Sequence, residues 1–138
     1  MVLIDSNILV YYFIASAPNH ARAEKYITSL VESDESIAIS PQIVMESFRA
    51  MTHEKIFEDR VNALEFREAI LSFLSDPAVT VIGPTMPAIG YALEVAAARN
   101  ISSSTIYDYQ IYDTMREHGI TRIATFNVKH FRNLEGIE

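Results

Sequence analysis

The chain contains no cysteine among its 138 residues. This absence excludes disulfide bonds, thiolate metal sites and cysteine nucleophiles, and it fits a reducing compartment. Glycine and proline are also scarce, with four and five copies, which excludes collagen-like and Pro/Gly-rich disordered classes. The apolar fraction of 49% suffices for one hydrophobic core, so we expect a single domain over residues 1–138.

Long hydrophobic runs are absent too. No stretch approaches the roughly 18 apolar residues that a membrane-spanning helix needs. The N-terminus has no basic region before its first apolar segment, so we expect no signal peptide. Together these features predict a cytoplasmic protein without a membrane partner.

Positive charge is the third deficit, because the net charge is −7. Proteins that bind nucleic acid through charge alone are usually basic. An acidic chain that handles RNA or DNA therefore needs local compensation, which a divalent cation held by carboxylates would provide. The same charge is ordinary for a soluble enzyme, so it does not decide between these functions.

Short apolar segments alternate with amphipathic ones along the chain. The strands are predicted at 2–4, 37–40, 79–82 and 122–125, and the helices at 8–14, 20–32, 41–51, 61–74, 85–99 and 106–118. Such alternation is typical of α/β proteins. We therefore predict a three-layer α/β/α sandwich with a mainly parallel central sheet of four to five strands. Residues 127–138 carry no clear pattern.

Polar side chains occur where the predicted strands end. Asp5 follows the first strand, Glu46 lies one helical turn after Pro41 beyond the second, and Asn127 follows the fourth. The helix that contains Asp108 leads directly into the fourth strand. Binding sites in open parallel sheets lie beyond the carboxyl ends of the strands, so these side chains are expected to share one cleft.

Asp5 carries the strongest signal. A carboxylate at the end of a wholly apolar strand must be capped, paired or bound to metal. The alternative is a helix N-cap made by Asp5 or Ser6. Asn7 is expected to order the same turn.

A helical wheel for 106–118 separates two acids. Asp108 falls on the apolar face with Ile111, which predicts an inward side chain that needs a partner. Asp113 falls on the polar face and is predicted to be solvated, outside the site. The alternative for Asp108 is a capping box with Thr105.

Glu46 lies off the apolar stripe of its helix. By itself it would be interpreted as a solvated acid paired with Arg49, but its helix starts where the second strand ends. The four histidines, His20, His53, His118 and His130, are scattered and are predicted to be structural or exposed. Basic residues that could contact phosphate are Arg49, Lys55, Arg60, Arg116, Arg122, Lys129 and Arg132.

Clustered carboxylates are suited to hard divalent cations. One or two such ions can activate water and stabilise an in-line phosphoryl displacement. The chain has no evident Ser-His-Asp set and no phosphate-binding lysine loop, so this chemistry is favoured over acyl transfer and nucleotide hydrolysis.

Taken in order, the motifs resemble PIN domains, and most closely the VapC-type toxins of toxin–antitoxin pairs. The resemblance covers nearly the whole chain and rests on residues 2–10, 40–46, 106–111, 117–122 and 124–127. It implies a Mg²⁺- or Mn²⁺-dependent endoribonuclease that acts on RNA. It further implies homodimers and a cognate antitoxin protein.

The resemblance also assigns roles to residues. Asp5 and Asp108 would be the principal metal ligands, Glu46 would bind directly or through water, and Ser6 would support the site by hydrogen bonding. Asn127 stands where many members carry a fourth acid, and His130 stands where relatives often have an acid.

These departures leave alternatives open. One is a catalytically degenerate PIN-like module that binds RNA or protein. A second is another Asp-centred α/β enzyme, although a haloacid-dehalogenase phosphatase would want an acid at position 7, and a phosphorelay receiver would want paired acids after its first strand. A third is a purely structural interaction protein.

Overall fold

A computed structural model describes all residues from Met1 to Glu138, and its centre is a four-stranded parallel sheet. The strands are β1 (Val2–Ile4), β2 (Ile37–Ile39), β3 (Val79–Val81) and β4 (Arg122–Ala124). They lie in the order β3-β2-β1-β4. Val2 of β1 is in register with Ile37 on one side and Arg122 on the other. The predicted parallel sheet is confirmed.

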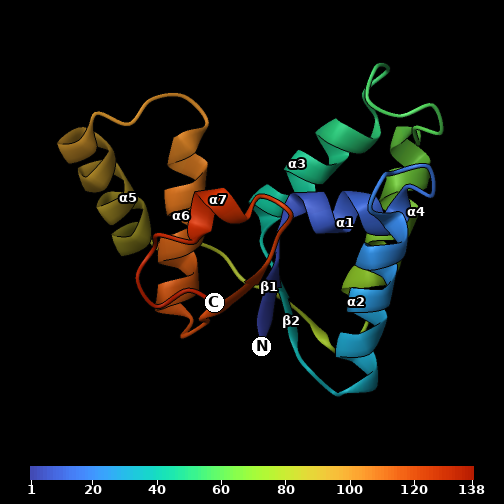
Figure 1. The fold of residues 1–138 in the computed structure, drawn as a ribbon, viewed down its shortest axis with the longest axis horizontal. Coiled ribbons are helices and arrows are strands. Elements are labelled where there is room, and N and C mark those ends of the chain that lie inside the picture. Colours follow the sequence, from blue (N-terminus) through green and yellow to red (C-terminus); the bar gives the residue numbers. More distant parts are fainter.

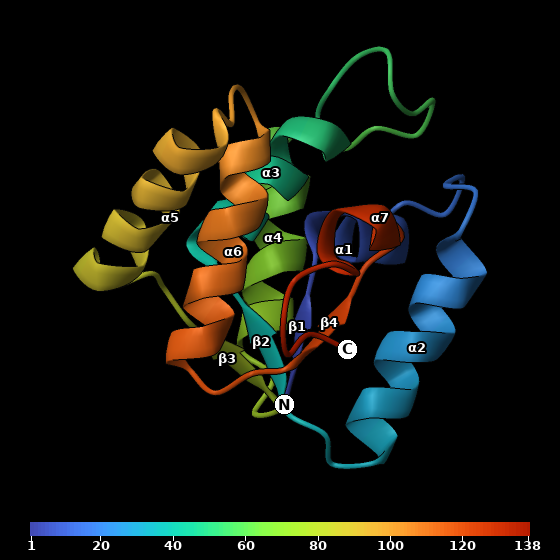
Figure 2. The ribbon, with the colours of Figure 1, turned by 60° about the vertical axis from the view of Figure 1, so that its left-hand side comes forward.

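Seven helices surround this sheet. They are α1 (Ser6–Phe13), α2 (His20–Glu32), α3 (Pro41–Met51), α4 (Ala63–Leu74), α5 (Met86–Arg99), α6 (Thr105–Glu117) and α7 (Val128–Phe131). Figure 1 shows α1, α2 and α4 on one side of the sheet and α5 and α6 on the other. After the turn in Figure 2, α6 lies in front of the sheet and of α4. The predicted three-layer sandwich is therefore confirmed.

Local sequence signals explain several helix boundaries. The Ser40 hydroxyl accepts a hydrogen bond from the Ile43 amide, and Pro41 occupies the first turn of α3, where its missing N–H costs nothing. Asn62 and Glu65 form a reciprocal capping box at the start of α4. Gly119 adopts a positive φ of 65° just after α6, which ends that helix.

The two central strands are the most deeply buried part of the chain. Every residue of β1 and β2 is buried, because helices cover both faces of the sheet. This is why both segments are wholly apolar. None of the helices is long and apolar enough to cross a membrane.

The strand order identifies where a site can form. The chain proceeds outward from β1 to β2 and β3, then returns to the other side of β1 to add β4. The direction of winding therefore reverses between β1 and β4. In doubly wound sheets the connections leave opposite faces at such a point, and a crevice opens beyond the carboxyl ends of the strands. Asp5 and Thr125 directly follow these two strands.

Candidate active site

Asp5 is the central acid of the site and is only 6% exposed. Its backbone amide donates to the Ala124 carbonyl across the β1–β4 pair, at 3.0 Å. One carboxylate oxygen accepts hydrogen bonds from the amide and hydroxyl of Ser6, at 2.7 and 3.3 Å. The other accepts from Asn7 Nδ2 and from the Thr125 hydroxyl, both at 2.6 Å. Asp5 is thus the N-cap of α1, as the alternative interpretation held, and also a fixed acid at the crevice.

Asn7 ties the first turn of α1 to the segment after β4. Its amide nitrogen lies 3.1 Å from Thr125 Oγ1, in addition to its bond to Asp5. Its oxygen accepts from the Phe126 amide at 3.0 Å. These contacts cross almost the whole length of the chain, and they give Asn7 the ordering role that its position predicted.

Glu46 reaches the site from α3. One carboxylate oxygen accepts from the Ser6 hydroxyl at 3.1 Å, and the other accepts from Gln42 Nε2 at 2.8 Å. No ion pair joins Glu46 to Arg49, so the interpretation of a solvated acid paired with that arginine is wrong. The Ser6 hydroxyl has one hydrogen and lies within reach of both Asp5 and Glu46, which links these two acids.

Asp108 lies in the first turn of α6 and is half-buried. Its Oδ2 is 3.1 Å from Nδ1 of His130 in α7. Burial raises the pKa of Asp108, the neighbouring His130 opposes this effect, and the negative charge of Asp5 adds to it. The two aspartates are therefore close enough to repel each other. The N-cap of α6 is Ser104, without a side-chain cap, so the capping box that was the alternative interpretation of Asp108 is absent.

Asn127 and His130 follow β4 and both contribute polar groups near the candidate site. The amide of Asn127 donates to Thr125 Oγ1 at 2.9 Å, and its side chain lines a pocket of about 200 Å³ with Ser6, Glu46 and Arg49. His130 was predicted to be structural or exposed, yet it contacts Asp108 directly. Its position on α7, one turn after Asn127, brings it to the site.

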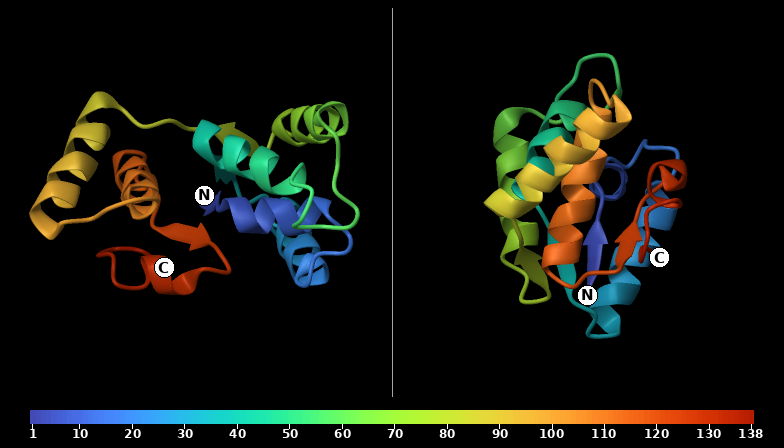
Figure 3. Two further views of the ribbon diagram at one scale, coloured as in Figure 1. Left: turned by 90° about the horizontal axis from the view of Figure 1, so that it is seen from above. Right: turned by 90° about the vertical axis from the view of Figure 1, so that its left-hand side faces the viewer.

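The prediction for Asp113 is wrong. The residue is only 3% exposed rather than solvated, because α5 packs along the face of α6 that the wheel assigned to water. Figure 3 shows this outer helix beside α6. Asp113 Oδ2 has no hydrogen-bond partner, and Oδ1 is 3.8 Å from Nη1 of Arg116. The charged neighbours of Asp113 are Arg116 and Glu117, and none of the candidate site residues is among them.

Thr125 is the residue that sequence reasoning missed. Its hydroxyl donates to Asp5 and accepts from Asn7 and from the Asn127 amide. The signal was available, because Thr125 directly follows the last strand, where polar side chains were sought.

The donor set can be tested against a divalent cation. Asp5, Asp108 and Glu46 offer the hard oxygen ligands that Mg²⁺ and Mn²⁺ prefer, and a cation would relieve the repulsion between the two aspartates. No three acidic or histidine side chains converge closely enough to hold an ion alone. Mg²⁺ typically uses only one or two carboxylates and keeps several waters, so the pair Asp5 and Asp108 fits it.

Known proteins resemble this chain across nearly its full length. A family model described as "PIN domain" matches residues 2–137. A curated relative, Ribonuclease VapC24 of Mycobacterium tuberculosis, is 22% identical over 131 residues, which cover 95% of this chain and 89% of the relative.

Two solved structures share the fold. The Mycobacterium tuberculosis toxin VapC20, described as cleaving the sarcin-ricin loop, aligns with a TM-score of 0.71 at 14% identity, over 94% of this chain and 92% of the toxin. A chain of a toxin–antitoxin complex from Klebsiella pneumoniae aligns with a TM-score of 0.64 at 17% identity. The alignment covers 100% of this chain and 96% of that one. The match over residues 2–137 contradicts the phosphatase and receiver alternatives.

Proposed function

This chain belongs to the PIN-domain family, and from that premise we propose that it is a divalent-metal-dependent endoribonuclease that hydrolyses RNA phosphodiester bonds. One observation carries the proposal. Acids from three separate elements, Asp5 after β1, Glu46 on α3 and Asp108 on α6, gather around the point where the sheet changes its direction of winding. Acids concentrated at this edge suit cation-assisted phosphoryl chemistry.

Asp5 and Asp108 would hold Mg²⁺ or Mn²⁺, and Glu46 would bind directly or through water. A bound cation supplies two things: it neutralises charge on the phosphodiester and lowers the pKa of a water molecule. The chain itself supplies orientation. The donors from Ser6, Asn7 and Thr125 hold both oxygens of Asp5 in fixed positions, so little rearrangement is needed when substrate arrives.

The negative charge of the site explains why a cation is needed at all. Asp5 and Asp108 would repel an approaching phosphodiester, and the net charge of −7 gives no general attraction for RNA. Asn127 and His130 add no further negative charge beside these acids. We propose that Asn127 orients substrate or water through its amide, since its side chain lines the pocket next to Glu46.

We also propose that the chain acts in the cytoplasm as the toxin of a toxin–antitoxin pair, and that it forms homodimers. The names of its relatives support the first part, because one is a ribonuclease of the VapC type and another belongs to a toxin–antitoxin complex.

Induced expression of the wild-type protein should arrest bacterial growth, whereas expression of the Asp5→Asn protein should not. Light scattering should give twice the 15.6 kDa of one chain, and a mass of one chain would refute the dimer.

A second candidate function is a PIN domain that binds RNA or protein without cutting it. Two observations favour it: Asn127 replaces an acid that many family members carry, and no three acids converge on one point. Metal-dependent cleavage distinguishes the two functions.

The deciding experiment incubates purified protein with a mixture of single-stranded and structured RNA in Mg²⁺, Mn²⁺ or EDTA. Asp5→Asn and Asp108→Asn are tested beside Asp34→Asn, which is exposed in a loop with a φ of 55° that asparagine tolerates. Cleavage should require metal, disappear in the first two variants and persist in the third. Cleavage that survives Asp5→Asn would refute the assigned site. No cleavage, with Mg²⁺ still raising the melting temperature, would favour the binding module.

A further inference from the structure

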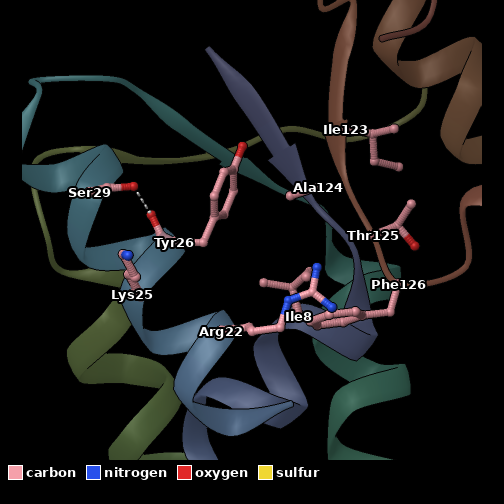
Figure 4. A pocket seen from close by; sticks show the side chains of 9 residues that line it. All are labelled: Ile8, Arg22, Lys25, Tyr26, Ser29, Ile123, Ala124, Thr125 and Phe126. Carbon is pink, nitrogen blue, oxygen red and sulfur yellow. Dashed lines mark hydrogen bonds between the residues drawn. The ribbon is translucent and has the colours of Figure 1, made fainter.

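A second pocket opens on the other side of the last strand. It has a volume of about 590 Å³ and lies between α2 and the segment formed by β4 and the residues that follow it. Figure 4 shows its walls, with Arg22, Lys25 and Tyr26 coming from α2 and the segment from Ile123 to Phe126 facing them. Two of its nine lining residues are cations and none is acidic. In a chain with a net charge of −7, this is a locally positive surface.

Neither positive charge of the pocket is neutralised by an ion pair, and the charge of Arg22 is also held in place. The guanidinium of Arg22 lies over the ring of Phe126, at 5.1 Å from its centroid, as Figure 4 shows. The ring itself packs against Tyr11, with centroids 5.2 Å apart. Neither Arg22 nor Lys25 forms an ion pair, whereas Arg60, Arg116 and Arg122 each lie beside an acid.

The pocket adjoins the candidate active site, with Thr125 and Phe126 between them. Thr125 lines the pocket, and its hydroxyl donates to Asp5 at 2.6 Å. Phe126, which carries Arg22 on its ring, donates its amide to Asn7. A ligand that extends along this wall therefore reaches the edge at which Asp5 is held.

We propose that this pocket binds the backbone of the RNA strand adjacent to the bond that is cut, with Arg22 and Lys25 contacting its phosphates. The inference rests on the proposed ribonuclease function and adds a subsite to it. Residues three apart on a helix have Cβ atoms about 5–6 Å apart, so both cations can engage one strand. A pair of unpaired cations in a pocket whose lining residues include no acid favours a polyanion over an apolar protein segment.

The first test measures binding rather than cleavage. A short, unstructured, fluorescein-labelled RNA is titrated in EDTA, and its anisotropy is followed at several salt concentrations. The double variant Arg22→Gln/Lys25→Gln is compared with Arg67→Gln/Arg99→Gln, which removes the same charge from α4 and α5. All four side chains are exposed, so both variants should fold.

The expected effect follows from counterion release. Loss of two phosphate contacts should make the negative slope of log K against log salt shallower by about 1.4, and weaken binding about 25-fold at roughly 0.1 M salt. The control variant should keep the wild-type slope. Equal binding by the two variants would overturn the subsite.

The absence of cysteine allows a positional test. Ser29→Cys introduces a single thiol in this pocket, and Ser72→Cys introduces one in the separate groove between α2 and α4. The RNA should slow the alkylation of the first thiol and leave that of the second unchanged. Equal protection of both thiols, or of neither, would contradict the proposed path of the strand.

The outcomes separate this inference from the proposed function. If wild-type protein cuts RNA in Mg²⁺ and both double variants cut and bind equally, the subsite is wrong and the ribonuclease stands. If nothing is cut but RNA binding still depends on Arg22 and Lys25, the ribonuclease fails and the subsite stands. If binding of a labelled polyglutamate peptide depends on Arg22 and Lys25 and binding of RNA does not, the pocket binds an acidic protein partner. The inference is then overturned.

Discussion

Asp113 offers the sharpest test of the packing described above. It is an acid that is 3% exposed, and its Oδ2 has no hydrogen-bond partner. The only opposite charge nearby is Arg116, 3.8 Å from Oδ1 and with its own side chain 53% exposed. A buried carboxylate with so little compensation should reduce the stability of the fold at neutral pH.

We therefore expect Asp113→Asn to stabilise the protein. A buried carboxylate without a partner costs about 1–3 kcal/mol, and a neutral amide in the same place costs less because it carries no charge to desolvate. The ion pair that is lost with a solvated arginine was worth about 0–1 kcal/mol, so the net gain should lie between about 0 and 3 kcal/mol. Asparagine has almost the same shape, so the packing of α5 on α6 is preserved. For a domain of this size, 1 kcal/mol corresponds to roughly 3–4 °C in melting temperature.

The raised pKa of Asp113 determines how the stability gain of Asp113→Asn should change with pH. Burial raises the pKa of Asp113 above its ordinary value of 3.8; Arg116 opposes this shift and Glu117 adds to it. The folded protein thus holds this proton more tightly than the unfolded chain, and stability is lost as pH rises through the raised pKa. The advantage of Asp113→Asn should be small below pH 3.8, should grow as pH rises, and should then level off.

Urea unfolding, followed by circular dichroism across this pH range, measures the effect. Asp34→Asn is the matched control, because Asp34 is exposed and its substitution should leave the free energy of unfolding unchanged. The reasoning would be refuted by an Asp113→Asn protein that is no more stable than wild type at neutral pH. A stability gap that does not vary with pH would also refute it.

Three further predictions concern the site. Thr125→Val removes a hydroxyl donor from Asp5 and should lower the free energy of unfolding by about 1–2 kcal/mol. Thr125→Ser keeps the hydroxyl and should keep the wild-type free energy of unfolding. Equal losses in urea unfolding for the two variants would argue against this hydrogen bond. Ser6→Ala breaks the link between Asp5 and Glu46 and should slow RNA cleavage roughly 10–100-fold with little change in stability, so an unchanged rate would remove Ser6 from the supporting role. Mg²⁺ should raise the melting temperature of wild type more than that of Asp108→Asn, and an equal shift would place the cation elsewhere.

The sheet and most helices could be predicted because their signals are local. The predicted bounds of the helices at 20–32 and 41–51 match α2 and α3, since Pro41 and the surrounding polarity mark their ends. The helix α7 could not be predicted. It has four residues, too few to show periodicity, and its buried Phe131 is 3% exposed only because of tertiary packing.

The location of the candidate site could be predicted from the strand ends, but its hydrogen bonds could not. The rule that sites form beyond the ends of parallel strands pointed to Asp5 and Asn127, and both lie there. It did not distinguish Thr125 from its neighbours, because a strand position says nothing of which hydroxyl meets which carboxylate. The Asp5 oxygens accept from residues one, two and 120 positions away, and the last of these contacts depends on the pairing of β4 with β1.

A helical wheel assumes one buried face, and α6 violates that assumption. Five consecutive residues, Ile111 to Met115, are buried in it, because α5 covers one side of the helix and the chain end near Glu135 accepts a hydrogen bond from Tyr112 on another. The wheel therefore placed Asp108 correctly toward the interior and Asp113 wrongly in water. The partner of Asp108 was beyond its reach as well, since His130 lies on another helix. Whether an acid on a helix is buried thus depends on every element that packs around the helix. These neighbours are known only once the fold is known.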